Sequence, residues 1–145
     1  MRQIYETQSD LENEKSISQV IENLCNLSLR KLSMKYFIDF IAFRNKKAVA
    51  VVEVKKRNNN HDTYPTLILS LAKYNRGAEF YRVNGLKFIF AVQFTDGCFF
   101  YEYRDDDRFE VELGGRTDRK DTEDIEPVIH IPINRMKSLA NRGPM

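Results

Sequence analysis

The sequence predicts an α/β fold in which a mixed central sheet is flanked by helices and followed by a C-terminal β extension. Three observations support this prediction: a helical apolar pattern comes first, two strongly apolar runs follow as a hairpin, and a second helical pattern leads into a further apolar run. The 145 residues hold no internal repeat and no linker rich in Pro, Gly or Ser. We therefore expect a single domain over residues 1–145, with its core at about 9–103 and the extension at about 104–145.

The first half of the chain is expected to form one helix and three strands. Ser9 or Asp10 can cap a helix that runs to about Asn26. One face of this helix carries, at helical spacing, Leu11, Glu14, Ile17, Ile21 and Leu24. A short strand is expected at 28–32, and longer ones at 36–43 and 48–55. The two longer strands are apolar on both faces, which is typical of central strands.

The second half is expected to start with a helix near Pro65, because the fixed φ of proline suits a first helical turn. The helix should end at Asn84-Gly85, and its apolar stripe comprises Leu67, Leu71, Tyr74, Ala78 and Tyr81. A buried strand at 88–92 and its hairpin partner at 98–101 follow, joined by a tight turn. Further strands are expected at 109–113 and 128–133, with a short helix after Asn134.

Composition excludes several classes of protein. No stretch approaches the roughly 18 uninterrupted apolar residues of a membrane span, so we expect an intracellular, cytoplasmic protein with no membrane partner. The two cysteines, Cys25 and Cys98, lack the spacing of a zinc site or a disulfide framework.

The net charge of +2 hides an uneven distribution along the chain. Residues 30–57 contain nine basic and two acidic residues, a net charge of +7, whereas residues 102–126 contain five basic and eleven acidic residues, a net charge of −6. A concentrated basic segment attracts a polyanion such as nucleic acid, because neutralised phosphates release their counterions. On charge alone, however, the favoured interpretation is that these lysines keep a hairpin and its turns soluble.

An aspartate, a glutamate and a lysine interrupt the two most apolar runs: Asp39, Glu53 and Lys55. Such residues are rarely buried without a partner or a metal. Glu53 and Lys55 lie two residues apart on a strand and therefore share one face, about 6 to 7 Å apart. A three-residue turn at 45–47 would pair Asp39 directly with Glu53, and a five-residue loop would preserve this parity. A two- or four-residue loop would separate the two carboxylates unless a bulge intervened.

Two opposed carboxylates would repel each other by roughly 3 kcal/mol at 5 Å and an effective dielectric constant near 20. A divalent cation offsets this repulsion, and Mg²⁺ prefers carboxylate oxygens together with water and substrate phosphate. Such an ion can activate water for phosphodiester hydrolysis, and Lys55 would orient that water or balance charge in the transition state.

Asp39 followed by Glu53-Val54-Lys55 on the next strand resembles the D…(D/E)xK signature of the PD-(D/E)XK nuclease superfamily. The resemblance covers roughly the first two thirds of the chain, although Ile38 stands where the signature has proline. It implies a restriction-endonuclease-like αβββαβ core and a Mg²⁺-dependent endonuclease, with Mn²⁺ as a substitute. It also implies small phage-type or Holliday-junction-resolvase-like enzymes that act on duplex, branched or single-stranded DNA, so the cytoplasm would be that of the host.

Further residues follow from the same resemblance. A glutamate on the first helix often completes the metal site, which favours Glu14 over Glu12 together with Asp39 and Glu53. Polar residues of the second helix often lie near the site, and the candidates here are Ser70, Lys73 and Tyr74. The DNA-contacting candidates are Lys35, Lys56, Arg57 and Lys73. A homodimer is conceivable because paired cuts on two strands need two sites.

Each signal also has a plainer interpretation. Glu and Lys two residues apart occur constantly on exposed strands, and Glu14 is about as consistent with a solvated helix position as with a metal ligand. His61 and His130 are interpreted as structural, and the run 104–108 as a solvated loop. The rival function is a nuclease-like fold that binds nucleic acid or protein without cleaving DNA.

Overall fold

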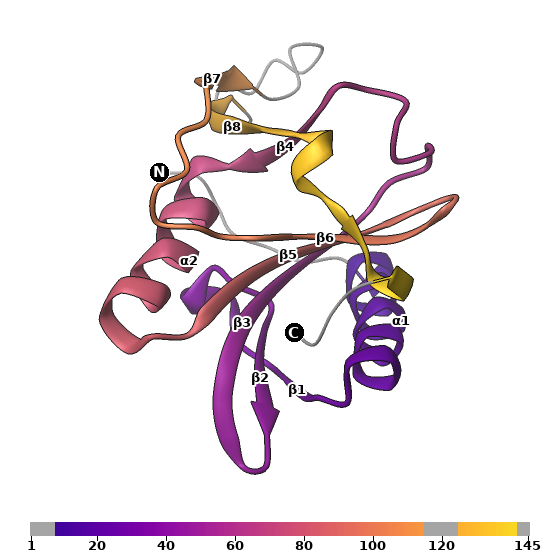
Figure 1. Ribbon diagram of the computed structural model, residues 1–145, viewed down its shortest axis with the longest axis vertical. Helices are drawn as coiled ribbons and strands as arrows, with labels where there is room; N and C mark the ends of the chain where they lie inside the picture. Colours follow the sequence, from indigo (N-terminus) through magenta and orange to yellow (C-terminus); the bar gives the residue numbers. More distant parts are fainter. Residues whose placement is uncertain (1–7, 115–124, 142–145) are drawn as a thin grey trace.

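The computed structural model describes residues 8–114 and 125–141 (Figure 1). The helices are α1 (Gln8–Cys25) and α2 (Leu71–Asn84), with short 3-10 turns η1 (Met34–Tyr36), η3 (Ile133–Arg135) and η4 (Leu139–Asn141). The strands are β1 (Ser28–Lys31), β2 (Phe40–Arg44), β3 (Lys47–Lys56), β4 (Thr66–Ser70), β5 (Lys87–Phe94), β6 (Gly97–Glu102), β7 (Val111–Gly114), β8 (Glu126–Pro132) and β9 (Lys137–Ser138).

The central sheet has six strands in the order β1-β2-β3-β5-β6-β9, and only the β3–β5 pair is parallel. The crossover between these two parallel strands contains β4 and then α2. The helices α1 and α2 lie on opposite sides of the sheet (Figure 1). The prediction of a mixed central sheet flanked by helices is confirmed.

Side-chain alternation along β3 divides the core into two layers. Val52 and Val54 pack with Ile17 and Ile21 of α1, whereas Val51 packs on the α2 side. The α2 side also carries a second sheet of three strands, in the order β4-β8-β7. The buried leucines and isoleucines of β4 and β8 pack on this layer. Charged side chains within β3 therefore face one of two well-packed surfaces.

The β2–β3 hairpin has a two-residue turn, one of the alternatives that the sequence left open. Asn45 and Lys46 both have positive φ, 52° and 67°, which is the signature of a type I′ turn. Arg44 pairs with Lys47, and a bulge between Ala42 and Phe43 shifts the register by one residue. The remaining pairs then match the predicted register, with Ile41 opposite Val51. The bulge thus restores the parity that a two-residue turn alone would have lost.

The strand predicted at 36–43 starts later than expected, at Phe40. Residues 34–36 form the 3-10 turn η1, and Phe37 closes it in the left-handed region with φ 62°. A left-handed residue reverses the direction of the chain and ends any strand at that point. Beyond it, Asp39 still accepts a hydrogen bond from the Leu32 N–H through its backbone oxygen, at 2.8 Å.

The prediction of a helix starting near Pro65 is wrong for the first six residues. Thr66–Ser70 form β4, which pairs antiparallel with β8, and α2 begins at Leu71. The alternation is that of a strand, since Leu67 and Leu69 are buried while Ile68 is exposed. Leu67 and Leu71 also satisfy helical spacing, so local pattern could not decide between the two structures. Pairing with a strand some sixty residues later decided it.

The C-terminal β extension is confirmed as β7, β8 and β9. The helix predicted after Asn134 is limited to the 3-10 turns η3 and η4. The predicted edge strand at 109–113 starts at Val111 instead. Gly115 and the charged stretch to residue 124 lie outside the described residues. Within the described part of the chain, neither helix is long and apolar enough to cross a membrane.

Candidate active site

Glu53 and Lys55 project from one side of the central sheet, and Asp39 lies beside them just before β2. Glu53 and Lys55 alternate with Val52 and Val54, which face α1, so both project toward α2. Asp39 lies in the bend one position before Phe40, which pairs with Val52, and its negative charge acts on both Glu53 and Lys55. The structure therefore brings together the two acids and the amine that the sequence singles out.

Asp39 is fixed by the end of the hairpin. Regular pairing of β2 with β3 stops at Phe40, and the Val54 N–H beyond it donates to Asp39 Oδ2 at 2.9 Å. The Asp39 carboxylate thus takes the place of a backbone acceptor that β2 no longer supplies. This hydrogen bond uses Oδ2 and leaves Oδ1 for other contacts. Asp39 Oδ1 lies 3.6 Å from Lys31 Nζ.

Lys73 reaches the same carboxylate cluster from α2. Its ammonium donates to Glu53 Oε2 at 2.5 Å. Gly77 lies one turn later on the same helix face, and a Cβ there would approach the Phe88 ring to 2.3 Å. Only glycine permits this close approach between helix and sheet. The close packing at Gly77 therefore sets how far Lys73 extends over Glu53.

Glu53 is the most unusual group in the structure, because its side chain is only 1 % exposed. Burial raises the pKa of Glu53 to about 8, the negative charge of Asp39 adds to the increase, and the nearby ammonium of Lys73 opposes it. Glu53 Oε1 is buried and has no hydrogen-bond partner among the described residues. An oxygen in this position is expected to have an occupant.

Lys55 is half-buried beside the two acids, with no hydrogen bond or ion pair to a described residue. Burial lowers the pKa of Lys55, the positive charge of Lys73 lowers it further, and the charge of Glu53 opposes the change. Burial also lowers the pKa of Lys73, but the charges of Glu53 and Asp39 outweigh this effect and raise it. The two amines are thus electrostatically distinct, one held by a carboxylate and one available.

Glu14 approaches the cluster from α1 through Lys31, a residue that the sequence interpretation missed. Lys31 Nζ lies 2.8 Å from Glu14 Oε1 and 3.6 Å from Asp39 Oδ1, so it bridges the two acids. Glu14 is only 12 % exposed, whereas Glu12 is exposed and accepts a hydrogen bond from Gln8. Lys31 lies on β1 next to β2, and this adjacency was the only signal that could have pointed to it.

The DNA-contacting candidates lie at different distances from this cluster. Lys73 is part of it, and the charge of Arg57 reaches Lys55. Lys56 is exposed at the end of β3, with its side chain on the opposite side from Lys55. Lys35 is exposed in η1, where its ammonium lies 5.3 Å from the centre of the Tyr36 ring. No contact joins Lys35 or Lys56 to the carboxylates in the described structure.

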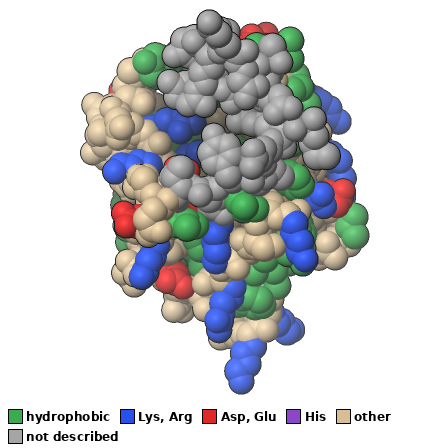
Figure 2. Space-filling view, turned by 180° about the vertical axis from the view of Figure 1, so that it is seen from behind, with side chains coloured by type: hydrophobic (Ala, Val, Ile, Leu, Met, Phe, Trp, Pro, Cys, Tyr) green, Lys and Arg blue, Asp and Glu red, His purple; other side chains and the backbone are tan. Residues whose placement is uncertain are grey.

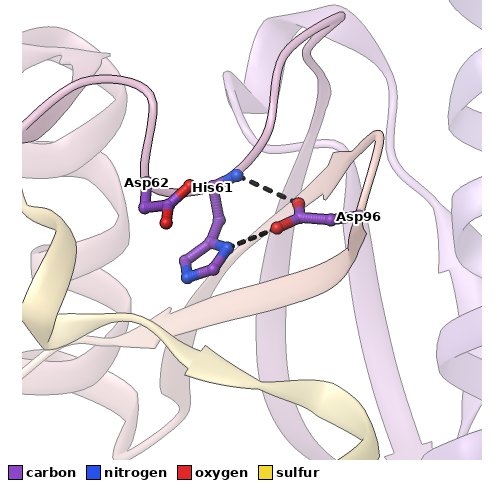
Figure 3. Close-up of side chains that lie close together, drawn as sticks. All are labelled: His61, Asp62 and Asp96. Carbon is purple, nitrogen blue, oxygen red and sulfur yellow. Dashed lines mark hydrogen bonds and ion pairs between the residues drawn. The ribbon is translucent and has the colours of Figure 1, made fainter.

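A second group of ionisable residues lies outside the cluster, between the loop after β3 and the β5–β6 turn (Figure 3). His61, Asp62 and Asp96 present ligand atoms within 4.8 Å of one another, the only such group of three in the described ranges. His61 Nδ1 is 2.5 Å from Asp96 Oδ2, and its backbone N–H donates to Asp96 Oδ1 at 3.0 Å. These bonds tie the loop to the β5–β6 turn. Glu14, Asp39 and Glu53 are not gathered this tightly.

His130 and the 104–108 run have partners that suit structural roles. His130 lies between Thr66 Oγ1, at 2.9 Å from its Nδ1, and Glu112 Oε1, at 2.6 Å from its Nε2. Asp107 binds Arg135 and accepts a hydrogen bond from the Tyr101 hydroxyl at 2.6 Å. Of the other helix candidates, Ser70 precedes the first residue of α2, and Tyr74 packs against Phe88.

Comparison with known proteins identifies the family to which the chain belongs. A family described as "Phage putative PDDEXK endonuclease" matches residues 1–139. Among solved structures, Hjc of Archaeoglobus fulgidus, a Holliday junction resolvase from an archaeal hyperthermophile, superposes with a TM-score of 0.55 at 15% identity, covering 87% of this chain and 96% of that chain. No curated protein matches the sequence. The restriction-endonuclease-like fold and the resemblance to PD-(D/E)XK nucleases are confirmed, and the chain belongs to the phage PDDEXK endonuclease family.

Proposed function

We propose that the protein is a divalent-metal-dependent endonuclease that hydrolyses DNA phosphodiester bonds at the cluster formed by Asp39, Glu53 and Lys55. One observation carries the proposal: a buried carboxylate whose oxygen Oε1 has no described partner, Glu53, lies close to a second acid, Asp39, and to the amine of Lys55. Family membership supports the same chemistry.

The donor set fits a hard cation. Asp39 Oδ1 has only a long contact to Lys31, at 3.6 Å, and Glu53 Oε1 has no described partner, so each acid offers one oxygen. Carboxylate oxygens are the ligands that Mg²⁺ prefers, and Mn²⁺ accepts the same ones. Glu14 would join them on release from Lys31. A bound cation would compete with the ammonium groups of Lys31 and Lys73, which neutralise the acids in its place.

Bound Mg²⁺ would supply polarisation of the phosphoryl group and a lowered pKa for an attacking water. The protein's own residues supply position and charge. Lys55, with its lowered pKa and without a carboxylate partner, is suited to orient the water or to balance charge on the phosphorane-like transition state. Lys73 holds Glu53 in place through its hydrogen bond. The reaction needs no covalent intermediate on the enzyme.

The basic segment 30–57 provides the surface for DNA in this proposal. Figure 2 shows Lys and Arg side chains spread over the rear face and down to its narrow lower end, where the β2–β3 turn carries exposed Lys46 and Lys47. We propose Lys35, Lys56 and Arg57 as DNA contacts, and of these three the charge of Arg57 acts on Lys55 at the proposed cut. Junctions or flaps in phage recombination would be the substrates, in the host cytoplasm, and a homodimer would place two sites on two strands.

A cleavage panel tests the proposal. Single-stranded, duplex, flap and four-way-junction DNA are incubated with the purified protein and Mg²⁺, Mn²⁺ or EDTA. We expect cleavage of at least one substrate with either metal and none in EDTA, since a metal of this kind lowers the barrier by several kcal/mol. The products are resolved on denaturing gels.

The rival function, a nuclease-like module that only binds DNA or protein, gives a different outcome. The ion pairs of Glu53 with Lys73 and of Asp39 with Lys31 are the observation in its favour. Such a module would bind DNA with a salt-dependent affinity that is indifferent to metal, and would cut none of the four substrates. That combination of results would overturn the proposed function.

Substitution of Glu14 tests the third metal ligand. Glu14→Gln is expected to weaken Mg²⁺ binding by about tenfold, since loss of one supporting carboxylate typically costs this much affinity. Isothermal titration with Mg²⁺ measures the effect, and Glu12→Gln, on the same helix but exposed, is the matched control. Equal affinities for the two variants would remove Glu14 from the proposed metal site.

A further inference from the structure

A cavity of about 360 Å³ opens at the end of β3, beyond the carboxylate cluster. The loop after β3 contributes Arg57, His61 and Tyr64 to its lining, and the strands β4 and β5 contribute Leu67 and Phe94. Its volume lies at the small end of the range for ligand pockets, roughly 300 to 1,000 Å³. A ligand of the size of one planar ring system with its attached sugar fits a cavity of this volume.

Arg57 connects this cavity to the candidate active site. Its backbone N–H donates to the Gln93 oxygen at 3.0 Å, so the pairing of β3 with β5 continues one residue past the end of the strand. Glu53, Lys55 and Arg57 consequently alternate onto one side, with about 6 to 7 Å between successive members. The cavity therefore begins about one such step beyond the amine that the proposed function places at the cleaved phosphate.

The lining combines an apolar floor with an aromatic and cationic rim. Leu67 and Phe94 are buried at the floor, whereas Tyr64 at the rim is 63% exposed. The His61 ring is held by Asp96 (Figure 3). The same ring stacks on Phe99, with ring centroids 4.2 Å apart. Exposed aromatic rings and guanidinium groups stack on nucleobases, whatever their sequence. A free phosphate, in contrast, would find a mainly apolar floor.

We propose that this cavity receives an unpaired nucleobase of the DNA strand that is cleaved, and so favours branched or single-stranded DNA over continuous duplex. The inference rests on the proposed function, because it takes the cut phosphate to lie at Lys55. A paired base must leave its stack before it can enter a pocket, whereas a base at a flap or junction has already done so. The free energy of stacking this base in the cavity then favours binding of DNA that already carries an unpaired base.

The test measures DNA binding in EDTA, so that no cleavage is needed. Full-length protein is titrated by fluorescence anisotropy with a duplex, with the same duplex carrying a single-stranded flap, and with that flap made abasic at its first unpaired position. Tyr64→Ala is expected to weaken flap binding by about tenfold and to leave duplex binding unchanged. Tyr81→Ala removes an exposed tyrosine of α2 that does not line the cavity, and should change neither.

The abasic flap identifies the partner of Tyr64. Wild-type protein should bind the abasic flap about tenfold more weakly than the intact flap. Tyr64→Ala should bind the two flaps with equal affinity, because the variant and the abasic site remove the same contact. A 2-aminopurine at that position should lose fluorescence on binding the wild-type protein but not Tyr64→Ala.

Three results would overturn the inference: equal losses by Tyr64→Ala on flap and duplex, no loss on either, or independent losses from the variant and the abasic site. No loss on either DNA would point to a cavity that serves a protein partner or no ligand. Independent losses would mean that Tyr64 contacts the DNA away from the first unpaired base. Failure of the proposed function is distinguishable, because it would appear as an absence of metal-dependent cleavage with the flap preference in EDTA intact.

Discussion

Asp39→Asn is expected to lower the rate of Mg²⁺-dependent DNA cleavage by at least about 1000-fold, which corresponds to roughly 4 kcal/mol of lost transition-state stabilisation. The amide keeps an oxygen that can accept the Val54 N–H, the hydrogen bond that fixes Asp39 at 2.9 Å, so the end of the hairpin should hold its structure. What the change removes is the negative charge that a cation needs. Single-turnover cleavage of the best substrate from the panel measures the rate.

Asp62→Asn is the matched control for this variant. Asp62 is an exposed aspartate in the group with His61 and Asp96, which could also hold a metal (Figure 3). We expect cleavage by Asp62→Asn to stay within about twofold of the wild-type rate. The reverse pattern, an active Asp39→Asn and an inactive Asp62→Asn, would move the catalytic metal to the loop after β3 and contradict the proposed site.

The central features of the site could be predicted because they depend on short-range pattern. Acids and a lysine within apolar strands stand out in any sequence, and alternation alone places Glu53 and Lys55 on one face. The pairing register of the hairpin could be predicted only as a set of alternatives. Nothing in the sequence of residues 44–49 shows that a type I′ turn is compensated by a bulge. In the structure, a two-residue turn and a bulge accompany an Asp39 that lies just before β2, close to Glu53.

The partners of the acids were less accessible to sequence reasoning. Lys31 and Lys73 belong to different elements, and each meets its carboxylate only through the packing of the whole domain. The same limit explains the wrong helix at 66–70, where pairing with the distant β8 outweighs a pattern that suits either structure. Phe37 shows a further limit, because a left-handed bulky residue has no local signature. Elements that depend on the local sequence pattern were predicted well, whereas elements that depend on contacts with distant parts of the chain were not.

The buried carboxylate has a consequence for stability. Burial and the charge of Asp39 raise the pKa of Glu53 from 4.5 to about 8 in the folded protein. Between these pH values the folded state binds a proton that the unfolded state has released, so the free energy of unfolding falls as pH rises. At 1.36 kcal/mol per pH unit the upper limit of this loss is roughly 5 kcal/mol. Ionised Glu53, the form that would bind a metal, therefore lowers the free energy of unfolding of the metal-free protein.

Glu53→Gln is therefore expected to stabilise the metal-free protein at high pH. Its amide oxygen can still accept the Lys73 hydrogen bond, and no buried charge forms. In EDTA we expect the variant and the wild-type protein to have similar free energies of unfolding near pH 5. Near pH 8.5 the variant should be more stable by at least about 2 kcal/mol. Urea denaturation at the two pH values measures the difference.

Glu12→Gln serves as the control, because it removes an exposed carboxylate and should leave the pH dependence of the wild type unchanged. A difference between Glu53→Gln and wild type that stays constant from pH 5 to 8.5 would mean that Glu53 does not exchange its proton on unfolding. The expected gain in stability should be reversed by Mg²⁺, which stabilises a folded state only where it can bind, by an amount that grows with its concentration. Wild-type protein should thus gain stability from Mg²⁺ at pH 8.5 while Glu53→Gln gains little, since a hard cation replaces the proton only on a carboxylate.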